Sequence, residues 1–507
     1  MHSQHFVNTL SSNEAKAYLV GGAVRDMLMG EAPKDRDYCV TGISQELFES
    51  LFPNAKLQGK DFPVYRMAID GEISEVALAR KERKVSSGHT GFRIQTSPEI
   101  KIEDDLARRD ITINSMAIDL ETNELIDPFH GEIDLQNKMI RATTQAFTED
   151  PLRVYRAARF AARYGFFIEY GTLMMMNKLK SELPSLSIER VTEEMKKALL
   201  TDNPSLFFYT LKTADVLDVH FPEINCLSEF DQNPEYHPEG NVFEHTMQVL
   251  EAARYLLRLW PVTSEVNVML SALLHDVGKA VTKGTNPKKG TVTYIGHEFA
   301  GVEIADKFLE KFNLHSNKKA VLFGVQKHMI FHEAFTKMKP GKAVDFIEGK
   351  FELVNGCSVR KPGVKTNLQI YDYITLCFAD IIGRLSSIKH IPDVISVMIQ
   401  IVAAYDTANN IEFDKIISLL KNHLSNTENA KRMAKDFLTA AKHKWIMENY
   451  QNQTLFVTCS LNVDELKQKY SGEKLGHIIH SDKRKQRTAS MREVRESAVK
   501  QVNITSQ

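Results

Sequence analysis

The sequence is poor in cysteine, and its five cysteines form no recognisable pattern. No two of them stand in a CxxC pair, which argues against a zinc ribbon and against a disulfide framework. Scattered single cysteines are typical of proteins kept in a reducing compartment. We therefore expect a cytoplasmic protein. The cysteines are Cys39, Cys226, Cys357, Cys377 and Cys459.

Long hydrophobic runs and an excess of either charge are also lacking. No apolar segment approaches the roughly 20 residues that a membrane-spanning helix needs. Residues 1–16 lack the basic stretch and apolar stretch of a secretory signal. The formal net charge is -1. Many nucleic-acid-binding domains are basic, but this chain as a whole is not. We expect no membrane association. Basic residues gather locally at 79–84, 107–110, 153–163 and 482–487, and we interpret the last group as a solvated surface.

The pattern of the chain changes near residue 150. A length of 507 residues predicts about three domains, at roughly 100–200 residues each. Up to about residue 140, short β-like runs alternate with turns; residues 65–80 read as a hairpin across Asp70-Gly71, and residues 110–129 as two further strands. Later segments have helical periodicity. The sequence therefore predicts an α+β fold, with a small head whose sheet is antiparallel or mixed and a long helical body. The polar last 35 residues or so are expected to be poorly ordered.

Residues 18–42, YLVGGAVRDMLMGEAPKDRDYCVTG, combine features of a phosphate and metal site. Gly21 and Gly22 follow an apolar run and let backbone amides approach a triphosphate at the start of a short helix that Gly30 ends. Arg25 adds a charge-assisted contact. The β-like segment DRDYCV places Asp35 and Asp37 on one face, and such oxygen ligands suit Mg²⁺. Two ions could clamp an attacking hydroxyl and a leaving pyrophosphate.

A second charged segment begins at TEDPLRVYRAARFAAR. Asp150 suits a helix N-cap and Pro151 the first helical position. At 100° per residue, the arginines of this helix share a sector of roughly 120° that faces solvent or an anion, and small apolar residues lie opposite. The arginines are Arg153, Arg156, Arg159 and Arg163; the apolar residues are Val154, Ala158, Ala161 and Ala162.

Four segments together resemble the tRNA nucleotidyltransferases, the CCA-adding enzymes, of the class found in bacteria and eukaryotes. They are LVGGAVRDMLMGEAPKDRDYCVTG, EDDLARRDITINSMA, EDPLRVYRAARFAARYGF and IERVTEEMKKAL, in that order. The resemblance implies a DNA polymerase β-like head that adds C, C and A to tRNA from CTP and ATP. It implies that Arg109 and Arg156 contact nucleotide phosphates, and that Asp150 and Arg153 read the base.

Other residues of these segments keep alternatives open. Asp110 and Asn114 are expected only to shape a turn, and Glu75 is a candidate third acidic neighbour of the metals. The loop at 79–92 lies where CCA-adding relatives carry a flexible loop that helps the switch from C to A. Bacterial poly(A) polymerases share the same head, so poly(A) synthesis is the first alternative function.

A further set of histidines and aspartates follows the head. His275 and Asp276 stand together in LLHDVGK, and the other members lie at helix starts or on apolar helices: His245, His297, His328 and Asp380. The set resembles the HD metal-dependent phosphohydrolase domain, which some bacterial CCA-adding enzymes carry. The resemblance implies that His245, His275, Asp276 and Asp380 bind a metal, with His297 and His328 for a second ion. Mixed imidazole and carboxylate ligands suit Ni²⁺ or Mn²⁺.

These observations predict four domains and leave two further alternative functions open. The domains are a head at 1–142, a neck and body at 143–230, an HD domain at 231–390 and a helical C-terminal region at 391–507. The resemblance to CCA-adding enzymes that carry an HD domain implies phosphatase, 2′-nucleotidase and 2′,3′-cyclic phosphodiesterase activity. The alternatives are a phosphohydrolase with an RNA-binding head and a non-catalytic RNA-binding protein.

Overall fold

The computed structural model of the chain divides into two compact units. The first contains Met1–Ala198 and Leu206–His220, and the second contains Leu199–Ser205 and Phe221–Gln507. The structure describes residues 1–58, 64–84, 92–333, 337–354, 357–361, 363–364, 369–385, 387–407, 411–424, 427–454, 457, 460–469, 472–501 and 504–505. In this part of the chain, no helix is long and apolar enough to cross a membrane.

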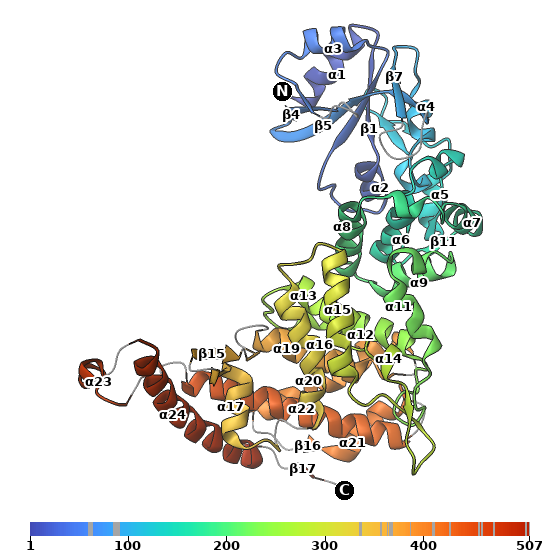
Figure 1. The fold of residues 1–507 in the computed structure, drawn as a ribbon. Coiled ribbons are helices and arrows are strands. Elements are labelled where there is room, and N and C mark those ends of the chain that lie inside the picture. Colours follow the sequence, from blue (N-terminus) through green and yellow to red (C-terminus); the bar gives the residue numbers. More distant parts are fainter. Residues whose placement is uncertain are drawn as a thin grey trace. The chain divides into compact units, whose positions relative to one another are not determined.

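The first unit combines a sheet with helices, as Figure 1 shows. Its strands are β1 Lys16–Val20, β2 Asp37–Thr41, β3 Lys56–Gln58, β4 Val64–Ile69, β5 Glu72–Leu78, β6 Arg80–Lys84, β7 Phe92–Thr96, β8 Ala117–Asp119, β9 Leu125–Ile126, β10 Met139–Ile140 and β11 Phe167–Ile168. Its helices are α1 Ser3–Ser11, α2 Gly22–Leu28, α3 Gln45–Leu51, α4 Ile102–Ala107, α5 Gly131–Gln136, α6 Arg153–Tyr164, α7 Tyr170–Lys178, α8 Ile188–Leu199, α9 Ser205–Thr213 and α10 Leu217–His220.

The sheet of the head is mixed. Its seven strands follow the order β3-β4-β5-β2-β1-β8-β9. Strands β2 and β5 are parallel, and the other neighbours are antiparallel. The predicted hairpin is confirmed, because β4 and β5 pair across Asp70 and Gly71, whose φ angles of 51° and 86° are those of a tight hairpin turn. The predicted helix that ends near Gly30 is confirmed as α2.

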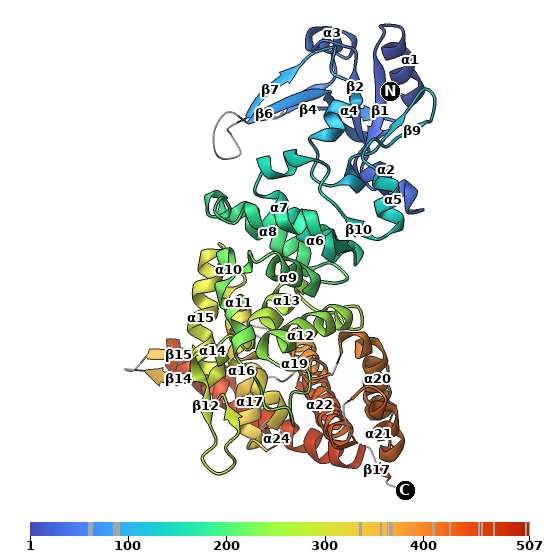
Figure 2. The same ribbon diagram turned by 90° about the vertical axis from the view of Figure 1, so that its right-hand side faces the viewer.

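Both faces of this sheet are covered. Phe6 of α1 and Phe48 of α3 are fully buried on one face, together with Val76 of β5. On the other face, Leu106 of α4 packs with Cys39 of β2. Figure 2 shows the helices around the sheet from the side. The cover is incomplete along β5, where Ile73 and Glu75 are exposed.

The two strands expected within residues 110–129 are β8 and β9, but the first is shorter than predicted. Residues 110–116 do not join the sheet, and Thr112–Asn114 form a 3₁₀ turn instead. Buried side-chain hydrogen bonds compete with strand pairing here. Asp110 accepts from the backbone N–H of Ile111 at 3.0 Å, and the Thr112 hydroxyl donates to Asp134 at 2.7 Å. The second half of the prediction is confirmed by the pairing of β8 with β9.

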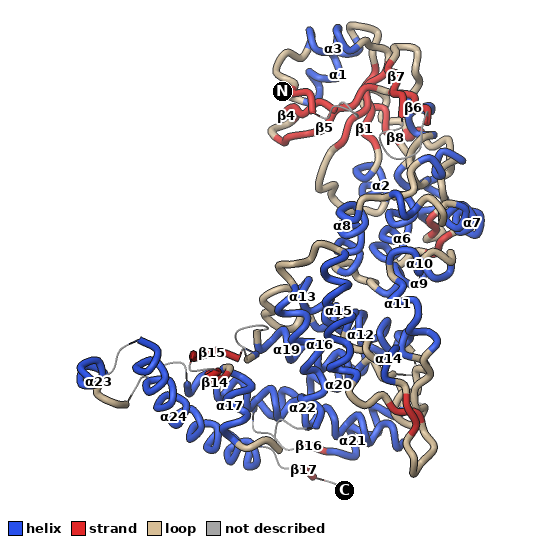
Figure 3. Tube along the Cα trace, viewed as in Figure 1, coloured by secondary structure: helices blue, strands red, loops and turns tan. Residues whose placement is uncertain are grey.

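The second unit is mainly helical, as the tube in Figure 3 shows. Its helices are α11 Pro222–Asn225, α12 Val242–Leu256, α13 Glu265–Leu274, α14 Lys279–Thr282, α15 His297–Lys311, α16 Lys318–Glu333, α17 Pro340–Glu348, α19 Ile370–Ile382, α20 Ile391–Thr407, α21 Phe413–Lys421, α22 Thr427–Thr454, α23 Val463–Lys469 and α24 Gly472–Gln501. Its short strands are β12 Gly284–Thr285, β13 Val292–Thr293, β14 Lys350–Val354, β15 Cys357–Lys361, β16 Ile411–Glu412 and β17 Ile504–Thr505.

The prediction of a poorly ordered tail is wrong for the described residues, since most of the tail forms α24. Met491 and Val494 of this helix are buried, because apolar residues recur there at helical spacing. The basic run at 482–487 is not wholly solvated either. Arg484 forms an ion pair with Asp345 of α17 at 2.6 Å.

Candidate functional site

A cavity of about 790 Å³ opens in the first unit. Its lining includes every residue predicted for the nucleotide and metal site of the head: Gly21, Gly22, Arg25, Asp35, Asp37, Arg109, Asp150, Arg153 and Arg156. Glu75 and Arg190 also line it. The loop predicted at 79–92 to help the switch from C to A is wrong for residues 80–84, which form β6, and its residues 85–91 lie outside the described residues.

Carboxylates gather at one side of this cavity. Asp37 and Glu75 are paired across β2 and β5. Partial burial raises the pKa of Asp37, the negative charges of Glu75 and Asp35 raise it further, and Arg109 opposes them. The prediction that one strand carries both aspartates is wrong, because β2 begins at Asp37 and Asp35 precedes it. The two side chains nevertheless reach the same cavity.

Gly21 lies directly beside a cavity arginine. Its φ angle is +69°, and a Cβ atom built on it would stand 2.8 Å from Nη1 of Arg109. The Gly21 N–H donates to the carbonyl of Met116 at 3.3 Å, which joins the end of β1 to the β8 side of the sheet. Glycine is therefore required here by both backbone conformation and space.

Buried carboxylates hold the arginines of the cavity in place. Asp105 is 1% exposed and accepts from Arg108 at 2.6 Å and from Arg109 at 3.1 Å. Asp110 accepts from Arg156 at 2.7 Å. Burial by itself would raise the pKa of Asp110, but the charge of Arg156 outweighs this effect and lowers the pKa to about 2. Asp110 thus does more than shape a turn.

Arg25 is also engaged inside the protein. It is 4% exposed, and its guanidinium donates to Asp26 at 2.7 Å and to the side-chain oxygen of Asn114. It lies over the ring of Tyr164, with 5.0 Å from its Cζ to the ring centroid. Arg25 therefore ties α2 to the turn that contains Asn114.

Asp150 and Arg153 stand at the start of α6. Oδ1 of Asp150 accepts from the N–H of Leu152 at 3.0 Å, which is the hydrogen bond expected of a cap, although the helix itself begins at Arg153. Oδ2 of Asp150 pairs with Arg190 at 3.2 Å. Arg153 donates to the carbonyls of Ala146 and Arg108, each at 2.6 Å. These contacts fix the orientation of both side chains at the cavity. The apolar face predicted opposite the arginines is buried: Val154, Ala158, Ala161 and Ala162.

A second cavity, of about 770 Å³, lies in the second unit. Asp276, His297, His328 and Asp380 line it. Two groups of three side chains could each hold a metal ion, and within each group the ligand atoms lie within 4.8 Å of one another. One group is His245, His275 and Asp380, and the other is Asp276, His297 and His328. All the residues predicted for the HD site are thereby brought together.

Three imidazoles of this site, those of His275, His297 and His328, share one orientation. Nδ1 donates to the backbone carbonyl three residues earlier at 2.8 Å in His275 and His328 and at 2.7 Å in His297. A carbonyl only accepts, so Nδ1 carries the hydrogen and Nε2 keeps its lone pair. Nε2 of His275 and of His297 each lies 3.2 Å from an oxygen of Asp276. Nε2 of His275 is buried and has no hydrogen-bond partner among the described residues.

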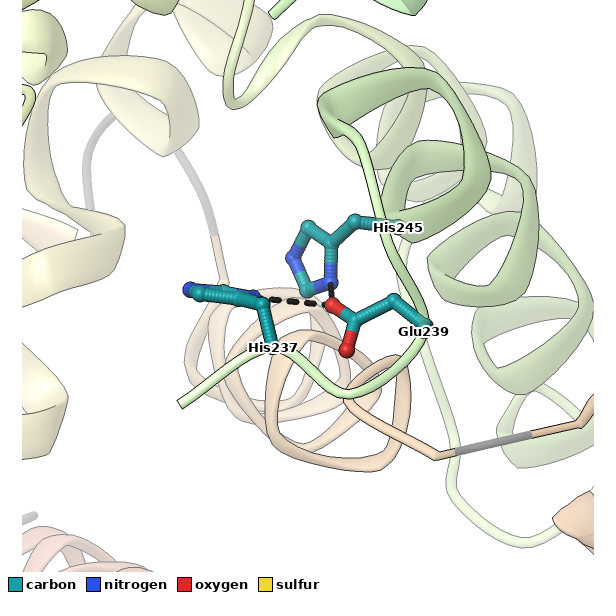
Figure 4. A group of neighbouring side chains, drawn as sticks. All are labelled: His237, Glu239 and His245. Atoms are coloured by element: carbon teal, nitrogen blue, oxygen red, sulfur yellow. Dashed lines mark hydrogen bonds and ion pairs between the residues drawn. The ribbon is translucent and has the colours of Figure 1, made fainter. Parts of the chain in front are cut away.

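His245 differs from the other histidines of this site. Its Nε2 lies 3.2 Å from Asp380, and its Nδ1 lies 2.7 Å from the carboxylate of Glu239. Figure 4 shows this glutamate between His245 and His237. Burial opposes protonation, but the hydrogen bonds to Asp380 and Glu239 outweigh it and raise the pKa of His245 to about 9. The site therefore favours positive charge next to Asp380, and a divalent cation supplies such charge.

Three family matches cover most of the first 350 residues. Residues 17–141 match the Poly A polymerase head domain, residues 165–227 the probable RNA and SrmB-binding site of polymerase A, and residues 242–350 the HD domain. A multifunctional CCA protein of Haemophilus influenzae (strain PittGG) is 40% identical over 375 residues, which are 73% of this chain and 85% of that protein. The chain belongs to the multifunctional CCA protein family.

A second multifunctional CCA protein, from Hahella chejuensis (strain KCTC 2396), is 42% identical over 323 residues, 62% of this chain and 73% of that protein. The fold is that of a solved CCA-adding enzyme with ATP, with a TM-score of 0.54 and 18% identity over 98% of this chain and 90% of that one. The Bacillus stearothermophilus CCA-adding enzyme in complex with CTP gives a TM-score of 0.53 at 16% identity over 98% and 97%. The predicted α+β fold and nucleotidyltransferase class are confirmed.

Several residues of the two sites were not predicted. Asp105 could have been found, because it stands three and four residues before Arg108 and Arg109 on one helical turn. Asp276 likewise stands three residues before Lys279, which donates a hydrogen bond to it at 2.6 Å. Glu194, which pairs with Arg159 at 2.5 Å, gives no such local signal because the partners are 35 residues apart.

Proposed function

We propose that the cavity of the first unit adds C, C and A in turn to the 3′ end of tRNA, using CTP and ATP and releasing pyrophosphate. One observation supports this above the others. The carboxylates of Asp35 and Asp37, the glycine pair and the arginines that the reaction needs line a single cavity. The reaction requires acidic metal ligands opposite cationic phosphate ligands, and this cavity offers both.

Asp35 and Asp37 are the proposed ligands of Mg²⁺, with Glu75 as their acidic neighbour. Oxygen ligands suit this ion, and the crowding of negative charge that raises the pKa of Asp37 favours a divalent cation. When bound, Mg²⁺ lowers the pKa of the tRNA 3′-hydroxyl and neutralises the leaving pyrophosphate. Gly21 and Gly22 would bring backbone amides to the triphosphate. Arg25, Arg109 and Arg156 would supply positive charge around it.

Asp150 and Arg153 would select the incoming base. An arginine offers paired donors and an aspartate paired acceptors, so together they can match the edge of cytosine or adenine without a nucleic-acid template. Their contacts with Arg190 and with backbone carbonyls support this role, because a template must hold a fixed orientation. The tRNA would be held through its phosphates and shape, so binding should weaken steeply with salt. With such a substrate, the protein would act in the cytoplasm.

The second cavity would be a phosphohydrolase centre. His245, His275, Asp276 and Asp380 are its proposed metal ligands, and His297 and His328 would bind a second ion with Asp276. The Nε2 atoms that face the carboxylates of Asp276 and Asp380 fit an ion such as Ni²⁺ or Mn²⁺. When bound, such an ion lowers the pKa of a water that attacks a phosphoester. Phosphatase, 2′-nucleotidase and 2′,3′-cyclic phosphodiesterase activities would clear damaged tRNA ends. We assign the functions to a head at 1–142, a neck and body at 143–230, an HD domain at 231–390 and a C-terminal region at 391–507.

The deciding experiment measures incorporation into tRNA that lacks CCA. We expect CTP alone to add a short limited run and ATP to be added only after C. Long runs from ATP without use of CTP would show a poly(A) polymerase instead. Replacing Asp35 and Asp37 with alanine should abolish incorporation and leave hydrolysis of a 2′,3′-cyclic nucleotide intact, whereas His275→Ala should do the reverse. Loss of hydrolysis in the aspartate variant would contradict the separation of the two sites.

A further inference from the structure

Glu239 lies between two imidazoles at the edge of the HD site. Its side chain is 0% exposed, and its Oε1 lies 2.8 Å from Nδ1 of His237 and 2.7 Å from Nδ1 of His245. Figure 4 shows both rings turned toward this one oxygen. The other oxygen, Oε2, is buried and has no hydrogen-bond partner within the described chain. A buried carboxylate is costly unless it is paired, and the two imidazoles supply that pairing for Glu239.

The loop before α12 places Glu239 over the first turn of that helix. The N–H of Gly240 donates to the carbonyl of His237 at 3.3 Å, and the φ angle of Gly240 is 117°, which only glycine adopts readily. Asn241 then caps the helix by accepting from the N–H of Glu244 at 3.0 Å. The chain thus folds back within a few residues, and Glu239 reaches His245 in the first helical turn.

His245 needs an acceptor from outside its own helix. In His275, His297 and His328, the carbonyl three residues earlier accepts the Nδ1 hydrogen. For His245, that carbonyl belongs to Val242 and accepts from the Thr246 hydroxyl, which is four residues further along, at 2.8 Å. The Gly383 carbonyl also hydrogen-bonds Nδ1, at 3.2 Å, so this carbonyl and the Glu239 oxygen at 2.7 Å together surround the Nδ1 hydrogen. Glu239 therefore does for His245 what the helix backbone does for the others.

We propose that Glu239 is a positioning residue of the HD centre. Its carboxylate holds a hydrogen of His245 on Nδ1 and fixes the ring, so that Nε2 faces Asp380 and is the nitrogen that a metal ion would take in place of its hydrogen. Histidines that bind metals generally donate their other N–H in this way, and loss of that partner weakens metal binding. The same carboxylate orients His237, whose ring lines the cavity. The proposal rests on the metal centre proposed above.

Glu239, His237 and His245 could instead be read as a metal site of their own. The distances argue against it. Ligands of one tetrahedral ion, each about 2.0–2.2 Å from it, stand more than 3 Å apart. The Oε1–Nδ1 distances of 2.7 and 2.8 Å are those of hydrogen bonds.

The test is a calorimetric titration of the full chain with Ni²⁺, made in an Asp35→Ala, Asp37→Ala background so that the head contributes no binding. Glu239→Gln should lower the affinity roughly 10–100-fold, because an amide that turns its NH₂ to His245 drives the hydrogen onto Nε2. Glu239→Asp keeps the negative charge, but its side chain is too short to reach His245 as closely, so the Ni²⁺ affinity should fall by less than in Glu239→Gln. Glu235→Gln is the matched control, since Glu235 lies in the same loop and pairs with Arg432 at 3.1 Å away from the metal ligands. Its affinity should equal that of the parent.

The outcomes separate this proposal from the one on which it rests. Unchanged binding in His275→Ala would remove the metal centre itself. Loss in His275→Ala with parental affinity in both Glu239 variants would overturn only the role of Glu239. Loss of one equivalent of Ni²⁺ in Glu239→Gln, with the remaining affinity unchanged, would make Glu239 a ligand and also overturn it. Melting temperatures of the metal-free variants give the second readout. A purely structural role lowers them without changing the metal affinity of the folded chain, and that result would also contradict the proposal.

Discussion

Asp37 of β2 and Glu75 of β5 occupy paired positions on two parallel strands, so their carboxylates meet at the same cavity. Partial burial and the charges of Glu75 and Asp35 raise the pKa of Asp37. Without a cation, this arrangement costs stability, because like charges opposite each other in a sheet repel. With a divalent ion, the same charges become ligands. Stability and metal binding therefore make opposite demands at this place.

Glu75→Gln should stabilise the metal-free protein and weaken its activity. We expect the free energy of unfolding at pH 7 in a chelator to rise by about 0.5 kcal/mol, measured with urea. Because the pKa of Asp37 is raised in the folded state, stability falls as pH rises through that pKa, and the variant should show a smaller fall. CTP incorporation should need more Mg²⁺. Glu72→Gln, at the start of the same strand, is the control and should change neither quantity. An unchanged Mg²⁺ requirement in Glu75→Gln would remove Glu75 from the site.

Gly21→Ala and Gly30→Ala should differ in their effect on the nucleotide. Both glycines have positive φ angles, and alanine costs roughly 1–2 kcal/mol in the left-handed region. A Cβ atom at Gly21 meets Arg109, whereas one at Gly30 meets nothing within 4 Å. We expect both variants to lose stability, but only Gly21→Ala to raise the KM for CTP, by displacing Arg109. Equal KM values in steady-state incorporation assays would contradict a role for Arg109 at the triphosphate.

The Asp110–Arg156 pair should contribute stability that depends on pH in a defined range. The pKa of Asp110 falls from 3.8 to about 2 in the folded protein. A lowered pKa means that the contribution is complete above 3.8 and is lost as pH falls toward about 2. Against Asp110→Asn, the wild type should lose an advantage of roughly 2 kcal/mol between pH 5 and pH 2, measured by urea unfolding. Asp215→Asn removes an exposed partner of Lys180 and should show little difference at any pH. A wild-type advantage that stays constant down to pH 2 would contradict the pairing.

Helix α6 shows which parts of the site could be predicted from the sequence and which could not. Local rules were sufficient for the helix and its arginine face, because both depend on residues within one or two turns, but the helix begins at Arg153 and not at Pro151. The partners of those arginines were not predicted. Asp110 is 46 residues from Arg156 and Glu194 is 35 from Arg159, and no periodicity connects them. Strand-like residues at 110–116 also misled the reading, since buried hydrogen bonds outweighed β propensity there.

By itself, the sequence determined the family, the hairpin at Asp70-Gly71 and the kinds of side chain present in both sites. These features depend on the local spacing and the chemistry of neighbouring residues. Only the tertiary structure decided which carboxylate pairs with which arginine, and that Glu239 contacts Nδ1 of His245. The physical reason is that hydrogen bonds and ion pairs act over about 3 Å in space and take no account of separation along the chain.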